Sequence, residues 1–138
     1  MTAGAPTRTL WCMTATKTDV GERFARALAA KDEAQLKALL RPGLDFRAMT
    51  PTRFWESTDP EEIVDATLLG MWFTPEREIV SLLAVDQDAS GPVDRVGYRL
   101  LVRRPDGDFV VEQQAYYQSE GDSITWLRIM CSGFVPAG

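Results

Sequence analysis

The sequence predicts an α+β fold in which helices come first and a strand meander follows. Three acidic residues in the first half are each followed three positions later by Glu or Gln, the pattern of a capped helix start. Four β-rich runs then follow, separated by short turns that permit only antiparallel neighbours. This order indicates an antiparallel sheet that curls around helices packed on one of its faces.

The helix starts define three helices. The capping pairs are Asp19 with Glu22, Asp32 with Gln35, and Asp59 with Glu62. The first two helices each carry one apolar stripe, and Pro42-Gly43 is expected to end the second. The third, from Pro60 to about Phe73, is apolar on almost every side, so we expect it to be nearly enclosed.

The strands follow from β-rich composition between turn residues. Leu44 to Thr50 predicts a short strand, followed by Pro51 and an aromatic turn at Phe54-Trp55. The four later strands are expected at about Arg77–Gln87, Arg95–Arg104, Asp108–Gln118 and Ser123–Phe134. In the second of these, alternation places Val96, Tyr98, Leu100 and Val102 toward the helices and Arg95, Arg99 and Arg103 on the opposite face.

Length and composition predict one domain, residues 18–138, after a flexible leader at residues 1–17, in which Met13 is an alternative start. The net charge of -5 gives no cationic surface, so we expect no nucleic-acid or membrane partner and a cytoplasmic protein. The chain has no histidine and two cysteines, Cys12 and Cys131. Zinc, Ser-His-Asp and Cys-His chemistry are therefore excluded, and no metal or cofactor is expected.

The stretch from Phe109 to Tyr117 is polar on both faces. Alternation puts Glu112, Gln114 and Tyr116 on one face and Gln113, Ala115 and Tyr117 on the other. We expect the first set to form the polar wall of a pocket and the second to meet a partner. The alternatives are that Glu112 pairs with an arginine such as Arg47 or Arg99, and that Gln114 and Tyr116 satisfy each other across the sheet.

The order of elements, together with L-D-F-R-A-M-T-P at Leu44–Pro51, F-W-E at Phe54–Glu56 and I-T-W-L-R-I-M at Ile124–Met130, resembles the nuclear transport factor 2-like superfamily. The resemblance covers about Asp19 to Pro136. It implies a cone-shaped α+β barrel, with three helices packed into a strongly curved sheet and a pocket at the open end. Relatives include ketosteroid isomerase, SnoaL-type polyketide cyclases, limonene epoxide hydrolase and binding-only proteins, so the fold does not fix an activity.

The resemblance also bears on catalysis. By approximate alignment, Ala48, Phe24 and Gln114 stand where ketosteroid isomerase has its base and its two oxyanion donors, so that mechanism is not expected. Glu112 remains as the candidate catalytic carboxylate for a cyclase, isomerase or dehydratase acting on a hydrophobic substrate. The alternatives are a non-catalytic ligand-binding or accessory domain, and pure interaction through the outer sheet.

Candidate contacts follow from residue type. Besides Gln114 and Tyr116, we expect the ligand to meet Tyr98, Phe24, Phe54, Trp55, Trp72 and Arg47. Each aromatic residue has the alternative of plain core, and Arg47 that of a solvent-side ion pair with Asp45. On the last strand the resemblance places Leu127, Ile129 and Cys131 inward. The outer face then gathers Tyr117, Trp126, Arg128 and Met130, which predicts a twofold homodimer.

Overall fold

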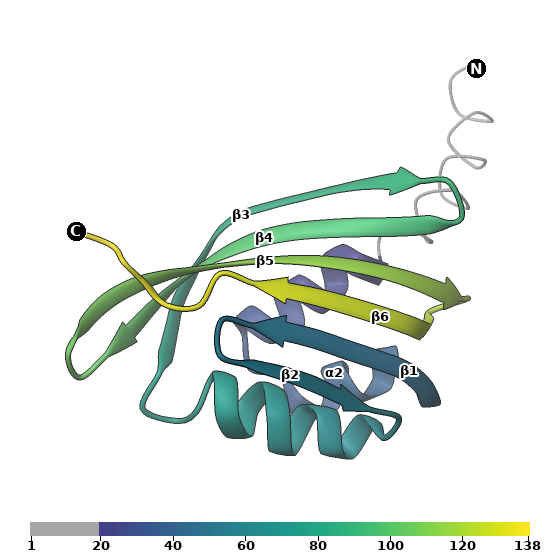
Figure 1. Cartoon of the computed structure of the whole chain (residues 1–138), viewed down its shortest axis with the longest axis horizontal. Coiled ribbons are helices and arrows are strands. Elements are labelled where there is room, and N and C mark those ends of the chain that lie inside the picture. Colours follow the sequence, from purple (N-terminus) through teal and green to yellow (C-terminus); the bar gives the residue numbers. More distant parts are fainter. Residues whose placement is uncertain (1–19) are drawn as a thin grey trace, which may run out of the picture.

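The computed structural model describes residues 20–138, and the predicted leader, Cys12 and the Asp19 cap lie outside them. Residues 20–29 are helical, α2 spans Glu33–Leu39, and a third helix begins at Pro60 and continues as η1, Glu62–Trp72. Figure 1 shows the first helix and α2 behind a curved sheet, with η1 along the edge next to β2. The predicted α+β architecture is confirmed.

The sheet has seven strands. They are β1 (Leu40–Thr50), β2 (Arg53–Ser57), β3 (Glu78–Ser90), β4 (Val93–Arg104), β5 (Gly107–Glu120), β6 (Ser123–Cys131) and β7 (Val135–Pro136). The order is β2-β1-β6-β5-β4-β3, and β7 pairs with the start of β5. The β1–β6 pair is parallel, so the sheet is mixed and the expectation of a wholly antiparallel sheet is wrong.

Two local predictions at the first strands also change. Phe54 and Trp55 lie within β2 and pair with Met49 and Ala48 of β1, so the turn is at Pro51-Thr52 and not at the aromatic pair. Residues 42–43 do not end α2, which stops at Leu39, but lie in an irregular part of β1. Leu40 before them and Asp45 after them pair with β6, and this tertiary pairing overrides the local turn signal.

The described helix caps follow the sequence. Asp32 Oδ1 accepts from the backbone N–H of Gln35 at 3.1 Å, and Asp59 Oδ1 accepts from that of Glu61 at 3.0 Å. The second cap is not a reciprocal box, because the Glu62 carboxylate accepts from the Ser57 hydroxyl instead. That bond ties the start of η1 to the end of β2.

The third helix is less enclosed than its composition suggests. Its backbone is of the π type, and the Phe73 N–H bonds the Leu68 carbonyl five residues back at 2.9 Å. The wider turn gathers Ile63, Val64, Thr67, Leu68 and Trp72 on one buried face. Ala66 and Met71 face solvent on the other side, so the prediction of near-complete enclosure is wrong.

A close contact joins the first helix to the sheet. The backbone N–H of Gly21 donates to the hydroxyl oxygen of Tyr117 at 3.0 Å. A Cβ at Gly21 would lie 2.6 Å from that oxygen, so glycine is required for the helix to approach β5 so closely.

Within residues 20–138, no helix is long and apolar enough to cross a membrane.

Candidate functional site

A cavity of about 470 Å³ opens between the end of η1, the β1–β2 turn and the segment that follows β6. Its walls are largely aromatic and aliphatic, with a few polar side chains. The cavity is lined by Thr50, Pro51, Thr52, Trp55, Met71, Trp72, Phe73, Arg77, Val111, Gln113, Cys131, Ser132, Gly133 and Phe134. An apolar cavity of this size with few polar groups is the usual form of a small-molecule site.

Gln113 is a polar residue of the cavity lining and is fully buried. Its Oε1 accepts from the Tyr98 hydroxyl at 2.6 Å. Burial raises the pKa of the Tyr98 hydroxyl well above its ordinary value of 10.0, with a smaller contribution from Cys131, so the hydroxyl keeps its proton and donates. This leaves the Nε2 of Gln113 as the free end of the amide, and no hydrogen-bond partner for it exists among residues 20–138.

Trp72 supplies a second donor without a partner. Its ring is 6% exposed at the end of η1, packed edge-to-face on Trp55 with centroids 5.9 Å apart. Its Nε1 likewise has no hydrogen-bond partner in the part of the chain that the structure describes. An indole N–H can only donate, and buried donors are nearly always paired in folded proteins. Two residues that line the cavity therefore carry a buried N–H group that needs an acceptor.

Arg77 and Phe134 form part of the cavity rim. One Arg77 nitrogen, Nη1, donates to the carbonyls of Met71 and Trp72, both at 2.8 Å, which closes the C-terminal end of η1. The guanidinium lies 4.7 Å from the centroid of the Phe134 ring. Phe134 in turn packs edge-to-face on Phe73. Arg77 thus connects the end of η1 to the Phe134 ring and places a positive charge at the rim of the cavity.

Cys131 faces Gln113 directly across the β5–β6 pair, and both line the cavity. Its sulfur accepts a weak hydrogen bond from the backbone N–H of Gly133 at 3.4 Å. No group of three or more metal-ligating side chains occurs within the described residues. Cys131 is thus a half-buried residue of the cavity lining with a free thiol, which can be used to report on ligand binding.

The two faces of β5 are reversed relative to our prediction: the face with Gln113 is buried, and the face with Glu112, Gln114 and Tyr116 points outward. Val111, Gln113, Ala115 and Tyr117 are at most 1% exposed, whereas Tyr116 is 41% exposed. The expected polar wall of Glu112, Gln114 and Tyr116 is therefore wrong, because these three side chains lie on the outer face of the sheet. The apolar packing of the alternate set against the helices decides the orientation.

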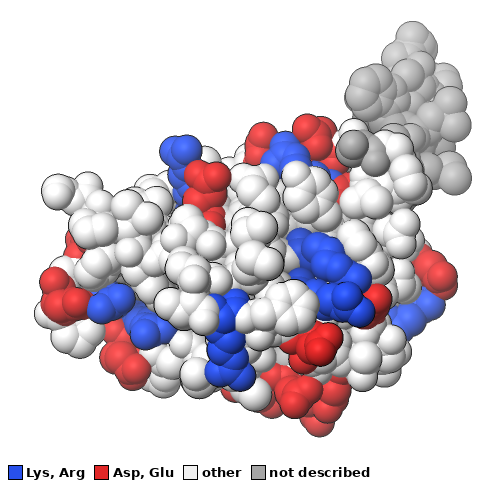
Figure 2. All heavy atoms as spheres, viewed as in Figure 1, with Lys and Arg blue, Asp and Glu red and all other residues white. Residues whose placement is uncertain are grey.

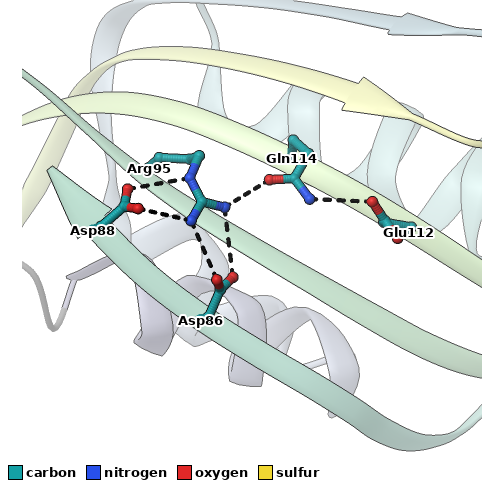
Figure 3. A network of polar contacts seen from close by, with 5 residues as sticks. All are labelled: Asp86, Asp88, Arg95, Glu112 and Gln114. Atoms are coloured by element: carbon teal, nitrogen blue, oxygen red, sulfur yellow. Dashed lines mark hydrogen bonds and ion pairs between the residues drawn. The ribbon is translucent and has the colours of Figure 1, made fainter. Parts of the chain in front are cut away.

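On that outer face the polar side chains satisfy one another (Figure 3). The Arg95 guanidinium donates to Asp88, to Asp86 and, at 2.7 Å, to the Oε1 of Gln114. The Nε2 of Gln114 donates to Glu112 at 3.3 Å. Arg99 pairs with Glu112 at 2.9 Å, as one of our alternatives proposed. Bonds from Arg99 first, and then from Gln114, lower the pKa of the Glu112 carboxyl from its ordinary value of 4.5.

Gly97 makes room for this network. A Cβ there would lie 2.7 Å both from Arg95 Nη1 and from Gln114 Oε1, so a larger residue would displace the ends of these two flexible side chains. The result is a shallow hollow of about 300 Å³ over β3, β4 and β5. The charged and amide side chains that line this hollow are paired with one another. A structural role within the sheet is therefore sufficient to explain them.

The other predicted ligand contacts separate into three places. Trp55 and Trp72 line the cavity, and Tyr98 lies behind it, bonded to Gln113. Phe24 is 1% exposed in the core between the helices and the sheet. Phe54 and Arg47 lie on the outer face, where Arg47 stands 3.6 Å from Asp45 as the alternative proposed.

The predicted outer face of β6 is confirmed, whereas that of β5 is not. Leu127 and Ile129 are buried and Met130 is 55% exposed. The Arg128 guanidinium covers the Trp126 ring at 4.3 Å and bonds Asp45. Tyr117, expected on this outer surface, is fully buried.

Gln113 is the site residue that the sequence prediction missed. The signal for it is the hairpin between β4 and β5, in which Arg104 pairs with Gly107 across a two-residue loop. Counting back from that loop pairs Tyr98 with Gln113 and Arg99 with Glu112. Directly paired residues share a face of the sheet, so the inward assignment of Tyr98 already required an inward Gln113.

No family model matches this sequence, and the search of curated proteins finds no relative. Solved structures do match. An epoxide hydrolase of M. tuberculosis described as LEH-like is 15% identical over 83% of this chain and 81% of its own, with a TM-score of 0.60. A nuclear transport factor 2-like protein from Burkholderia thailandensis is 13% identical over 85% and 91%, with a TM-score of 0.64.

A third structure is a hypothetical protein with a ketosteroid isomerase-like fold from Catenulispora acidiphila, solved in complex with trimethylamine. It is 14% identical over 85% of this chain and 88% of its own, with a TM-score of 0.66. Together these likenesses confirm the nuclear transport factor 2-like fold that the sequence motifs suggested.

Proposed function

We propose that this chain binds a small, largely apolar molecule in the cavity that Gln113 lines. The observation that carries the proposal is the pair of buried N–H donors, Gln113 Nε2 and Trp72 Nε1. Neither has a partner among the described residues, and both belong to residues that line one cavity of about 470 Å³. Leaving such donors unpaired is costly, at about 1–3 kcal/mol each. A bound molecule with an acceptor, or water in its absence, relieves this cost.

The composition of the cavity favours binding over carboxylate catalysis. Among the described lining residues there is no Asp or Glu, and Glu112 lies on the outer face, held by Arg99. Proton transfer by a side chain needs a titratable group within hydrogen-bond reach of the substrate. The hypothesis of a cyclase, isomerase or dehydratase with Glu112 as the base therefore loses its geometric support.

The test is a pair of neighbouring substitutions on β5. A panel of neutral aromatic and isoprenoid compounds is screened by thermal shift, and hits are measured by calorimetry. Val111→Phe fills the cavity and is expected to weaken binding at least about tenfold. Val110→Phe, on the outer side of the same strand, serves as the matched control and is expected to leave affinity unchanged.

The location is checked with Cys131 in a Cys12→Ser background. A bound ligand is expected to slow alkylation of the Cys131 thiol, because the sulfur belongs to a cavity residue. A panel without hits, or hits that neither protect Cys131 nor respond to Val111→Phe, would contradict the proposal.

A second function, homodimerisation, is favoured by the outer sheet face. Figure 2 views this face and shows an uncharged band between groups of charged side chains. Met49, Phe54, Tyr116 and Met130 are each 41–55% exposed there, and they line a nearly apolar groove of about 210 Å³. Exposed apolar groups of this kind mark interaction sites, and a twofold copy is the simplest partner.

The dimer is tested by sedimentation velocity. Phe54→Glu with Met130→Glu is expected to give a folded monomer, since like charges would face each other across the twofold. Val135→Glu, at an equally exposed valine outside the groove, is the control and should leave the dimer intact. Sedimentation of the unaltered chain as a monomer at micromolar concentration would exclude this function.

A further inference from the structure

The cavity presents hydrogen-bond donors without matching acceptors. The Oε1 of Gln113 already accepts from Tyr98, whereas the Nε2 has no partner among the described residues, so the unsatisfied end of the amide is its N–H end. Trp72 offers only its indole N–H. The two residues come from β5 and η1 and line different walls of the same cavity.

Three hydroxyl side chains also belong to the wall, and two of them, those of Thr50 and Ser132, are already engaged. The third, that of Thr52, lies exposed at the β1–β2 turn. The Thr50 hydroxyl accepts from the Trp55 indole at 3.1 Å and donates to the Arg53 carbonyl. The Ser132 hydroxyl accepts from the Glu112 N–H at 2.9 Å and donates to the Gly133 carbonyl. Arg77 is the charged residue among the described lining side chains, and its charge is positive.

We propose that the cavity selects molecules carrying a carbonyl-type oxygen and rejects amines, the oxygen being held between Gln113 Nε2 and Trp72 Nε1. The inference rests on the proposed binding function and names its ligand class. An oxygen acceptor satisfies two donors that are otherwise unpaired, whereas an ammonium group would meet N–H groups and the Arg77 cation with no carboxylate to balance it. Trimethylamine, which the Catenulispora acidiphila protein binds, is the wrong class for this chain.

The experiment compares three probes that share one aromatic skeleton: methyl naphthyl ketone, isopropylnaphthalene and naphthylethylamine, the last protonated at neutral pH. Affinities for the full chain are measured by calorimetry. The ketone is expected to bind at least about tenfold more tightly than the hydrocarbon, and the amine to bind most weakly of the three. Equal affinity for ketone and hydrocarbon, or tightest binding of the amine, would overturn the ligand class while leaving cavity binding intact.

Proton NMR of the nitrogen-labelled chain gives a readout that needs no substitution. The ketone is expected to move the indole N–H signal of Trp72 and the side-chain amide signals of Gln113 downfield, and the hydrocarbon is not. Movement of neither signal by a bound ketone would refute the assignment of the two donors. If none of the three probes binds, the ligand class and the binding function fail together.

Gln113→Glu provides the converse test, because it keeps the acceptor for Tyr98 and replaces the free N–H end by oxygen. The preference for the ketone over the amine is expected to fall by at least about tenfold relative to the unaltered chain. Gln114→Glu, the neighbouring change on the outer face, is the control and is expected to keep the original preference. An unchanged preference in a folded Gln113→Glu variant would count against the inference.

Discussion

Gln113 and Gln114 are adjacent residues of the same type with opposite surroundings. Both ends of the Gln114 amide are paired, with Arg95 on one side and Glu112 on the other. Gln113 is fully buried, yet only its oxygen is paired among the described residues, and the residue lines a cavity. The Gln114 amide on the outer face of β5 therefore has hydrogen-bond partners at both ends, whereas within residues 20–138 the Gln113 amide on the inner face has a partner at one end only. Incomplete polar pairing in a buried place is the stronger indication of a ligand.

The largest effect should come from placing a charge on the inner face. Ala115→Lys buries an ammonium in a fully enclosed position and is expected to destabilise the fold by more than about 4 kcal/mol. Gln118→Lys, on the outer face of the same strand and outside the apolar groove, is expected to change stability by less than about 1 kcal/mol. Urea unfolding of both variants measures the difference, and equal losses would mean that the faces of β5 are wrongly assigned.

A smaller effect is expected at the buried pair of Tyr98 and Gln113. Tyr98→Phe leaves the Gln113 amide with neither end paired, at an expected cost of about 1–3 kcal/mol. Adding Gln113→Leu removes the stranded amide, so the double variant should recover most of that loss. The measurement is a double-mutant cycle by chemical unfolding. Simple additivity would show that the hydrogen bond does not couple the two residues.

The smallest effect concerns Glu112 on the outer face. Because its folded pKa is lowered by Arg99 and Gln114, the carboxylate stabilises the fold above its ordinary pKa of 4.5. That contribution is lost as the pH falls through the lower folded value. The stability difference between the unaltered chain and Glu112→Gln should therefore be small at neutral pH, disappear in acid, and shrink with added salt, since the pair is partly exposed. A difference that grows on acidification contradicts the ion pair.

Much of the architecture follows from local sequence signals. The Asp32 and Asp59 caps, the positions of the four later strands (β3 to β6) and the inner faces of β4 and β6 are confirmed, because each depends on neighbouring residues or on a clear apolar alternation. β5 differs because both of its faces carry polar and aromatic groups, and alternation alone does not say which set is buried. Its orientation is decided by β4, through the hairpin register.

Two further features depend on distant parts of the chain. The π-type turn of η1 aligns Ile63, Val64 and Leu68 on one buried face, and an apolar composition read at α-helical spacing does not reveal it. The parallel pairing of β1 with β6 joins two segments that are far apart in the sequence. No turn residues between them predict this pairing.

That parallel pair has a consequence for synthesis. Met49 of β1 is paired with Met130 of β6, so β1 has its second neighbour only after nearly all the described residues have left the ribosome. Until then the nascent chain carries β1 and β2 as a two-stranded ribbon, which is marginally stable on its own. Segments so far apart must be brought together before their contacts stabilise anything, which makes folding slow. The exposed edge of β1 is thus the part of the emerging chain that most needs protection from aggregation.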